Sequence, residues 1–76
     1  MGIEKMSSNN AILIKEIGPK IEVRDICLDT YPEHPGFLIA IIEDSSYSLK
    51  TAIKISQNYM RENVVEYGIH FIWNPF

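Results

Sequence analysis

The segment FLIAII, Phe37–Ile42, sets the strongest constraint on what this chain can fold into. Its six residues are all apolar and do not alternate with polar ones, which is typical of a β-strand buried on both faces. We therefore expect this strand to be central in its sheet. The chain has only 76 residues, and a domain of that size buries only about 60% of the surface of its unfolded chain. A strand that needs cover on both faces therefore suggests self-association or a partner.

The region before this strand predicts a β-hairpin. Two β-rich runs, at roughly 11–17 and 21–28, flank the turn sequence Gly18–Lys20. In the second run the apolar positions change from odd-numbered residues such as Ile21 to even-numbered ones such as Ile26. A slip of one residue moves side chains to the opposite face or marks a β-bulge. Apolar side chains are therefore expected on both faces of the sheet.

The region after the strand predicts one long helix. The acidic and serine residues at 43–46 favour a helix start, because such side chains cap free N–H groups and suit the helix dipole. We expect the helix to extend to about residue 67, with Gly68 ending it and a length of roughly 30 Å. Its expected inward stripe has spacings of three and four and consists of Leu49, Ala52, Ile53, Ser56, Met60, Val64 and Tyr67.

The last segment, IHFIW, alternates and predicts a final strand closed by Pro75. The element order is then β-β-β-α-β. This order predicts an α+β two-layer sandwich, with one long helix packed on a four-stranded, mostly antiparallel sheet. We expect residues 1–9 to form a flexible N-terminal tail and residues 10–76 to form a single small domain.

One helix covers only one face of such a sheet, so the second face requires an explanation. Several apolar residues cannot all lie under the helix: Ile12, Ile14, Ile26, Leu28, Ile72 and half of 37–42. We therefore expect an exposed apolar patch on the order of several hundred Å² on the second face, more than a monomer usually leaves in water. This patch predicts an interface, either in a homodimer packed sheet to sheet or with another protein.

Charge and cysteine content limit the partners and the location. The net charge of −3 gives no electrostatic attraction to nucleic acid or to an anionic membrane. Cys27 is the only cysteine, so the chain has no internal disulfide, which favours a reducing, cytoplasmic location. No apolar run approaches the ~20 residues that cross a bilayer. We expect no membrane partner, and nucleic acid is an unfavoured one.

The candidate catalytic and metal-binding residues are weak. Cys27 has acids and aliphatic residues as sequence neighbours rather than a base, so we interpret it as a small buried apolar residue. Asp29, Glu33 and His34 offer oxygen and nitrogen ligands, but their spacing matches no zinc or calcium motif. A second histidine would have to come from His70, far along the chain. We expect no cofactor and no metal.

Other polar groups also have ordinary explanations. Glu43 and Asp44 form an acidic pair at the helix start, where capping accounts for them without catalysis. The same acids repel a phosphate, and the segment lacks glycines that let backbone approach an anion. Lys50, Lys54 and Arg61 form only a thin basic stripe on the outer side of the helix. We therefore expect no catalytic residue.

The residues expected to contact a partner come from three places. The loop 29–36, with two prolines and a glycine, offers exposed side chains for recognition, and the apolar strand and the aromatic C-terminus offer anchors. A terminal carboxylate can also be captured by a partner's backbone. The candidate partner-binding residues are Tyr31, His34, Leu38, Trp73 and Phe76.

These features favour a small non-catalytic protein-interaction module. It would be an accessory subunit, inhibitor or adaptor, for example one that presents a peptide to a partner enzyme, and would act through an apolar sheet face, a sheet edge or the C-terminal tail. Another protein or a second copy would be its partner. One alternative is an antitoxin-like or nucleic-acid-associated regulator, since the β-β-β-α order resembles that of small antitoxin domains of the HicB type in element order alone. A further alternative is a small oligomeric enzyme with an intersubunit site.

Overall fold

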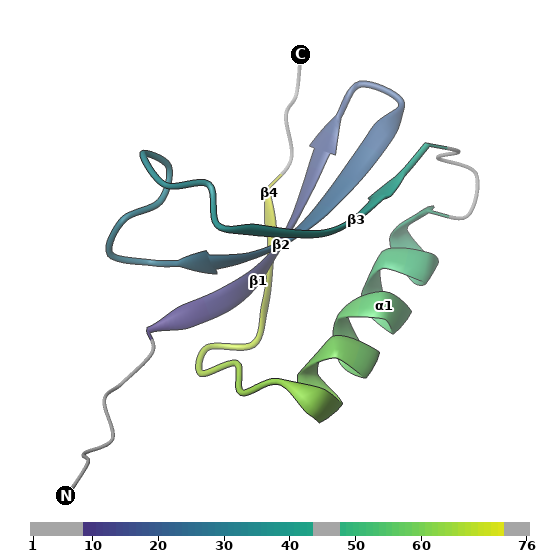
Figure 1. Cartoon of the computed structure of the whole chain (residues 1–76). Helices are drawn as coiled ribbons and strands as arrows, with labels where there is room; N and C mark the ends of the chain where they lie inside the picture. Colours follow the sequence, from purple (N-terminus) through teal and green to yellow (C-terminus); the bar gives the residue numbers. More distant parts are fainter. Residues whose placement is uncertain (1–8, 44–47, 73–76) are drawn as a thin grey trace, which may run out of the picture.

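The structure, a computed structural model, describes residues 9–43 and 48–72. Its elements are β1 (Asn10–Ile17), β2 (Lys20–Cys27), β3 (Phe37–Ile42), α1 (Ser48–Glu62) and β4 (Ile69–Ile72). The predicted element order and fold class are confirmed, because α1 packs on one face of a four-stranded sheet (Figure 1). The chain is an α+β two-layer sandwich.

The strand order in the sheet is β3-β2-β1-β4. β2 pairs antiparallel with both β1 and β3, and β4 pairs parallel with β1, so the sheet is mostly antiparallel as predicted. The prediction that Phe37–Ile42 is a central strand is wrong, because β3 lies at one edge. An unbroken apolar run reports that both faces of a strand are apolar, but it does not report how many neighbours the strand has in its sheet.

The phase slip predicted in the second strand corresponds to a change of face: β2 pairs regularly with β1, and Ile26 lies on the opposite face from Ile21 and Val23. The β-bulge of this sheet is on β3 instead. In the pairing of β2 with β3, Val23 lies opposite Ala40 and Arg24 lies opposite Leu38, which leaves Ile39 as an extra residue on β3. The ladder therefore changes phase at this point. Before Ile39, the odd-numbered residue of β3 lies on the helix side of the sheet. After Ile39, the even-numbered residues lie on that side.

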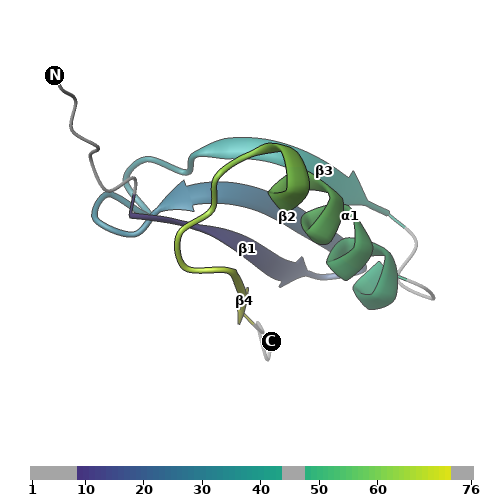
Figure 2. The same cartoon turned by 90° about the horizontal axis from the view of Figure 1, so that it is seen from below.

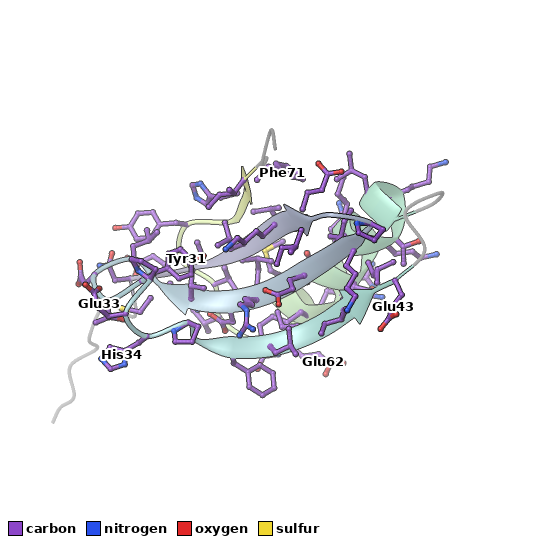
Figure 3. The ribbon with its side chains drawn as sticks, turned by 90° about the horizontal axis from the view of Figure 1, so that it is seen from above. Tyr31, Glu33, His34, Glu43, Glu62 and Phe71 are labelled. Carbon is purple, nitrogen blue, oxygen red and sulfur yellow. The ribbon has the colours of Figure 1, made fainter. Side chains whose placement is uncertain are left out.

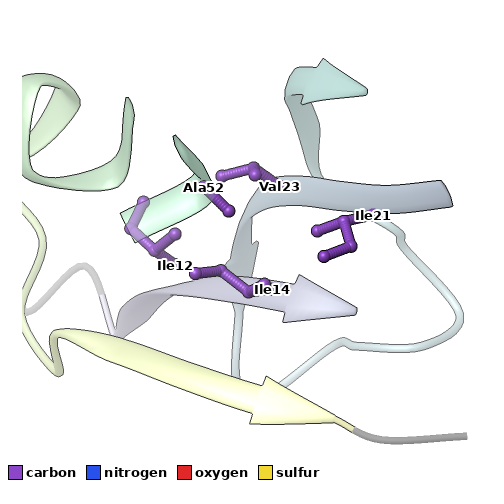
Figure 4. Close-up of a cluster of buried hydrophobic side chains, with 5 residues drawn as sticks. All are labelled: Ile12, Ile14, Ile21, Val23 and Ala52. Carbon is purple, nitrogen blue, oxygen red and sulfur yellow. The ribbon is translucent and has the colours of Figure 1, made fainter. Parts of the chain in front are cut away.

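The main core lies between α1 and the sheet. Figure 4 shows its buried side chains, which come from β1, β2 and α1: Ile12, Ile14, Ile21, Val23 and Ala52. Because side chains alternate along a strand, the neighbours Ala11 and Leu13 point to the opposite face. They are buried as well, with Leu13 only 3% exposed. β1 is therefore covered on both faces.

The helix is shorter than predicted. α1 has 15 residues and ends at Glu62, where the backbone N–H and the side-chain amide of Asn63 both donate to the Tyr59 carbonyl, at 2.9 and 3.1 Å. Gly68 lies beyond the end of the helix and adopts a φ of 74° just before β4. The prediction that Gly68 ends the helix is therefore wrong.

The predicted inward stripe is correct only in its middle. Ala52 and Ser56 are fully buried, and the Ser56 hydroxyl donates to the Ala52 carbonyl at 2.8 Å. Three members of the stripe are exposed instead: Leu49, Val64 and Tyr67. Val64 and Tyr67 are exposed because they lie in the connection after the helix, where the spacing of three and four residues no longer sets the direction of a side chain.

This connection is attached to the start of β1 through Asn10. The Asn10 side-chain amide donates to the Val64 carbonyl and to the Asp25 carboxylate, both at 3.0 Å, and its side-chain oxygen accepts from the Glu66 N–H at 3.1 Å. The Tyr67 N–H donates to the Asn10 backbone carbonyl at 3.0 Å. The early helix end and these bonds bring the chain round to run parallel to β1 (Figure 2).

Candidate protein-binding edge

β3 is an edge strand with several exposed apolar side chains. Across residues 9–43 and 48–72, no strand pairs with the outer side of β3. None of its six residues is buried, and the exposed fractions of Phe37, Leu38 and Ile41 are 62%, 38% and 43%. An edge strand presents unpaired backbone N–H and C=O groups, so β3 combines a hydrogen-bonding edge with apolar side chains.

The exposed side chains of β3 lie on both sides of the sheet. Leu38 is opposite Arg24 and Ile41 is opposite Glu22, so both lie on the face that α1 does not cover. Phe37 is opposite Asp25 and therefore lies on the helix side. Apolar surface consequently continues around the edge from one face to the other.

The face that α1 does not cover is less apolar than predicted. Lys15 from β1 and the pair Glu22 and Arg24 from β2 lie in its middle, so the apolar surface is divided instead of continuous. Arg24 Nε is 2.9 Å from Glu22 Oε1, and this hydrogen bond raises the pKa of Arg24. Exposed apolar side chains remain on this face at Leu38 and Ile41 of β3, at Ile17 at the end of β1 and at Ile72 of β4.

β3 lacks the residues that usually protect an edge strand. Lysine and proline side chains and strong bulges keep such edges from pairing with other chains. The sequence of β3 contains neither a charged residue nor a proline, and its bulge at Ile39 is the one irregularity in its pairing with β2. The other edge strand, β4, has only four residues and includes the exposed His70.

The two ends of β3 differ in character. Figure 3 shows Glu43 at one end of the strand and His34 near the other. Gly36, just before β3, adopts a φ of 78°, and a Cβ atom there would collide with the Asp25 carbonyl oxygen. Glycine therefore lets the start of β3 lie close against β2, with no side chain at that position.

The structure brings together two of the predicted partner-binding residues. Tyr31 is partly buried and close enough to Arg24 to contribute to its raised pKa, and Leu38 is the cross-strand neighbour of Arg24. His34 is exposed in the adjoining loop (Figure 3). Trp73 and Phe76, the other two, lie outside the described residues.

The loop that carries Tyr31 and His34 is closed by its own backbone hydrogen bonds. The N–H groups of Thr30 and Tyr31 donate to the Cys27 carbonyl at 3.2 and 2.9 Å, and the His34 N–H donates to the Thr30 carbonyl at 3.0 Å. The Tyr31–Pro32 peptide bond is cis. The loop is therefore a compact turn next to the start of β3, and not an extended connection.

The residues considered for catalysis and metal binding are not brought together. Cys27 is partly buried at the end of β2, while the two histidines lie near opposite edges of the sheet, His34 before β3 and His70 on β4. Within the described part of the chain, no group of three or more His, Cys, Asp and Glu residues is placed to hold a metal ion. Asp44 lies outside that part, and Glu43 is exposed. The basic residues of α1 are exposed, as predicted: Lys50, Lys54 and Arg61.

Sequence reasoning missed one polar contact between the two layers. The Tyr59 hydroxyl of α1 donates to Asp25 Oδ2 of β2 at 2.7 Å, and the other carboxylate oxygen of Asp25 accepts from Asn10. The hydrogen bond to Asp25, together with burial, raises the pKa of Tyr59 to about 12. This contact joins the helix to the sheet and to the connection before β4, so we interpret it as structural. Tyr59 is one residue away from the predicted stripe, which is the signal that could have found it.

No described helix is both long enough and apolar enough to cross a membrane. Comparison of the chain with protein-family models, with curated proteins and with solved structures finds no match. The functional conclusion therefore depends on the chain's own geometry.

Proposed function

We propose that this chain is a small non-catalytic protein-interaction module that binds its partner through the outer edge of β3 and the adjoining apolar side chains. The observation that carries the proposal is the position of an entirely apolar, exposed six-residue strand at the edge of the sheet. Natural edge strands are usually protected against pairing, and β3 has neither a charged residue nor a proline for this purpose, so it is expected to have a partner.

Strand addition is the binding mode that this edge supports. An extended segment that pairs with β3 would gain backbone hydrogen bonds along the strand, and its alternate side chains would contact the two faces of the sheet. Leu38 and Ile41 would meet the side chains on the uncovered face, and Phe37 those on the helix side. This binding mode uses the backbone edge of β3 together with its exposed apolar side chains on both faces of the sheet.

The proposal includes the setting inferred from the sequence. A cytoplasmic accessory subunit, inhibitor or adaptor fits the single cysteine, and the net charge of −3 favours a protein partner over nucleic acid. The partner is another protein or a second copy of the chain.

Affinity capture from the native cell with matched variants tests this proposal. Ile41→Lys places a charge on β3, whereas Ile72→Lys places the same charge on β4, at a site of similar exposure on the same face, 38% against 43%. We expect the wild-type chain and the Ile72→Lys variant to retain the same protein, and the Ile41→Lys variant to lose it. Retention of that protein by Ile41→Lys, or no specific capture by the wild-type chain, would contradict the proposal.

A further inference from the structure

We propose that the partner of β3 is β3 of a second copy, so that two molecules form one continuous sheet with four strands from each copy. This inference rests on the proposed function and specifies its partner. Two identical edges related by a two-fold axis can only pair antiparallel. The question is whether the β3 sequence suits antiparallel pairing with itself.

The faces of β3 match in one full-length register. With Phe37 opposite Ile42 of the second copy, Leu38 falls opposite its Ile41. Within one copy, Phe37 and Ile42 both lie on the helix side, because they pair with Asp25 and Ile21 of β2. Leu38 and Ile41 both lie on the uncovered face, because they pair with Arg24 and Glu22. Each cross-strand pair therefore joins apolar side chains on the same face.

The bulge makes this register possible. In a regular strand, residues five apart point to opposite faces, so Phe37 and Ile42 would not match. The extra residue Ile39 changes the phase and puts them on the same face. A shift of the pairing by one residue would set helix-side side chains against side chains of the uncovered face. The bulge, which usually protects an edge, here makes the edge complementary to itself.

The ends of the paired strands are also compatible. In the same register Glu43 of one copy lies next to Gly36 of the other, a position with no side chain. The two Glu43 carboxylates lie at opposite ends of the strand pair. Each is beside the start of the other copy's β3, which follows the loop with His34 (Figure 3). Like charges directly opposite each other, which destabilise strand pairs, are therefore avoided.

The two α1 helices lie on the same face of the joined sheet. α1 packs over β2 and β3 (Figure 2), so the axes of the two α1 helices would lie two to three strand spacings apart, about 10–14 Å. Packed helices have axes about 8–10 Å apart. This separation equals or exceeds that of packed helices, so the two helices flank the two-fold axis on one face of the joined sheet, and the paired strands carry the interface.

The first test is the solution mass of the purified chain, by sedimentation equilibrium from about 200 µM to about 1 µM, a range suited to a small interface. We expect a dimer at the upper end that dissociates on dilution. Ile41→Lys should be monomeric throughout, while Ile72→Lys should dimerise like the wild type, with circular dichroism confirming that both variants fold. A wild-type chain that is monomeric at every concentration, or an Ile41→Lys variant that dimerises like the wild type, would overturn the proposal.

The second test examines the register by disulfide trapping, which still reports the pairing if the cysteine variants are somewhat less stable than the wild type. In a Cys27→Ser background, chains with Leu38→Cys are mixed with chains with Ile41→Cys under mild oxidation. The two cysteines are directly opposite in the proposed register, within disulfide reach, whereas two copies of Leu38→Cys are offset by about 10 Å along the strand, beyond the ~7 Å limit. We expect disulfide-linked heterodimers and at least tenfold less linkage in either chain alone. Equal linkage in all three samples would overturn the register.

The outcomes separate this inference from the proposed function. A chain that is monomeric when pure, yet captures another protein through β3 in the native cell, would overturn the self-pairing and leave the interaction module standing. A chain that is monomeric and captures nothing would overturn both. A dimer that is insensitive to the β3 variants would overturn the self-pairing through β3.

Discussion

β1 and β3 have similar apolar runs and very different surroundings. β1 contains AILI, residues 11–14, and all four of these residues are buried. β3 is FLIAII, residues 37–42, and none of its residues is buried. β1 lies inside the sheet, with β2 on one side and β4 on the other, whereas β3 has β2 as its one neighbour among the described strands.

The difference shows that an apolar strand is buried only where neighbouring strands pair with its edges and other elements pack on its faces. For β1 it comes from the same chain: α1 packs on one face, and both edges are hydrogen-bonded. For β3 the fold supplies one paired edge and partial cover from α1. The strand has the composition of a central strand and the position of an edge strand, and the proposed pairing with a second copy would remove this mismatch.

The largest expected effect comes from truncating the same residue type in the two strands. Ile12→Ala opens a cavity in the core at a residue with no exposed surface, and we expect it to lower the free energy of unfolding by about 2–5 kcal/mol. Ile41→Ala removes a side chain that is already half in water, and should lower it by less than about 1 kcal/mol in dilute protein. Urea denaturation at about 1 µM measures both.

The same pair of variants also tests the second copy. If β3 pairs with itself, the loss caused by Ile41→Ala should grow as the protein concentration rises, because dimerisation stabilises the folded state by mass action. The loss caused by Ile12→Ala should change much less. Equal concentration dependence in the two variants would remove the distinction between β1 and β3.

Glycine substitutions test how closely β3 is held to β2. Gly36→Ala combines a left-handed backbone conformation with a collision against the Asp25 carbonyl, and we expect a loss of about 2–4 kcal/mol. Gly18→Ala, in the β1–β2 turn, has a similar φ of 58° but no atom near the new methyl group, so only about 1 kcal/mol should be lost. Thermal unfolding of both variants gives the comparison. Equal losses would show that β3 can move away from β2 at little cost.

The contact between Tyr59 and Asp25 joins α1 to β2, the part of the molecule that is buried within one chain. Tyr59→Phe removes a hydrogen bond to a carboxylate, and we expect a loss of about 1 kcal/mol near neutral pH. Because the pKa of Tyr59 is raised from about 10 to about 12, its contribution is complete below pH ~10 and disappears as the pH rises through ~12. The stability difference between the wild type and Tyr59→Phe should therefore shrink over this range, as measured by urea unfolding. A difference that stays constant to pH ~12 would contradict the assignment.

The smallest expected effect concerns the ion pair in the middle of the uncovered face. Arg24→Gln removes the partner of Glu22, but both side chains are about one-fifth exposed, so the loss should be below about 1 kcal/mol and should decrease with added salt. Denaturant titrations at two salt concentrations measure this. A larger loss that is independent of salt would mean that this face is more closed than its exposure indicates.

The sequence predicts the elements of this fold better than their neighbours in the sheet. Alternation, turn residues and helical spacing are local signals, and they predict the hairpin and the start of α1 close to their observed positions, whereas the bulge lies on β3 and not on the second strand. The position of β3 at an edge depends on which strands pair, and the apolar run of Phe37–Ile42 does not distinguish an edge covered by another molecule from a central strand. The helix end was misplaced because Val64 and Tyr67 continue the apolar spacing after the backbone has left the helix.

Of the candidate site, the sequence predicted the apolar strand and the neighbouring loop but not their relation. Leu38 and Tyr31 belong to different segments, and their shared neighbour Arg24 follows only from the register of β2 and β3. The contact from Asn10 through Asp25 to Tyr59 joins residues distant in sequence, so helical spacing can indicate that Tyr59 faces the sheet but cannot identify its partners. The periodicity of apolar residues does not show which distant segments pair with each other.

Amide hydrogen exchange, compared between dilute and concentrated protein, tests the central claim most directly. The claim is that β1 is covered within its own chain and β3 by a second copy. We predict that amides of residues 11–14 exchange slowly at both concentrations, and that amides on the outer side of β3 exchange quickly in dilute protein and slowly in concentrated protein. Exchange in β3 that does not change with concentration would contradict the claim.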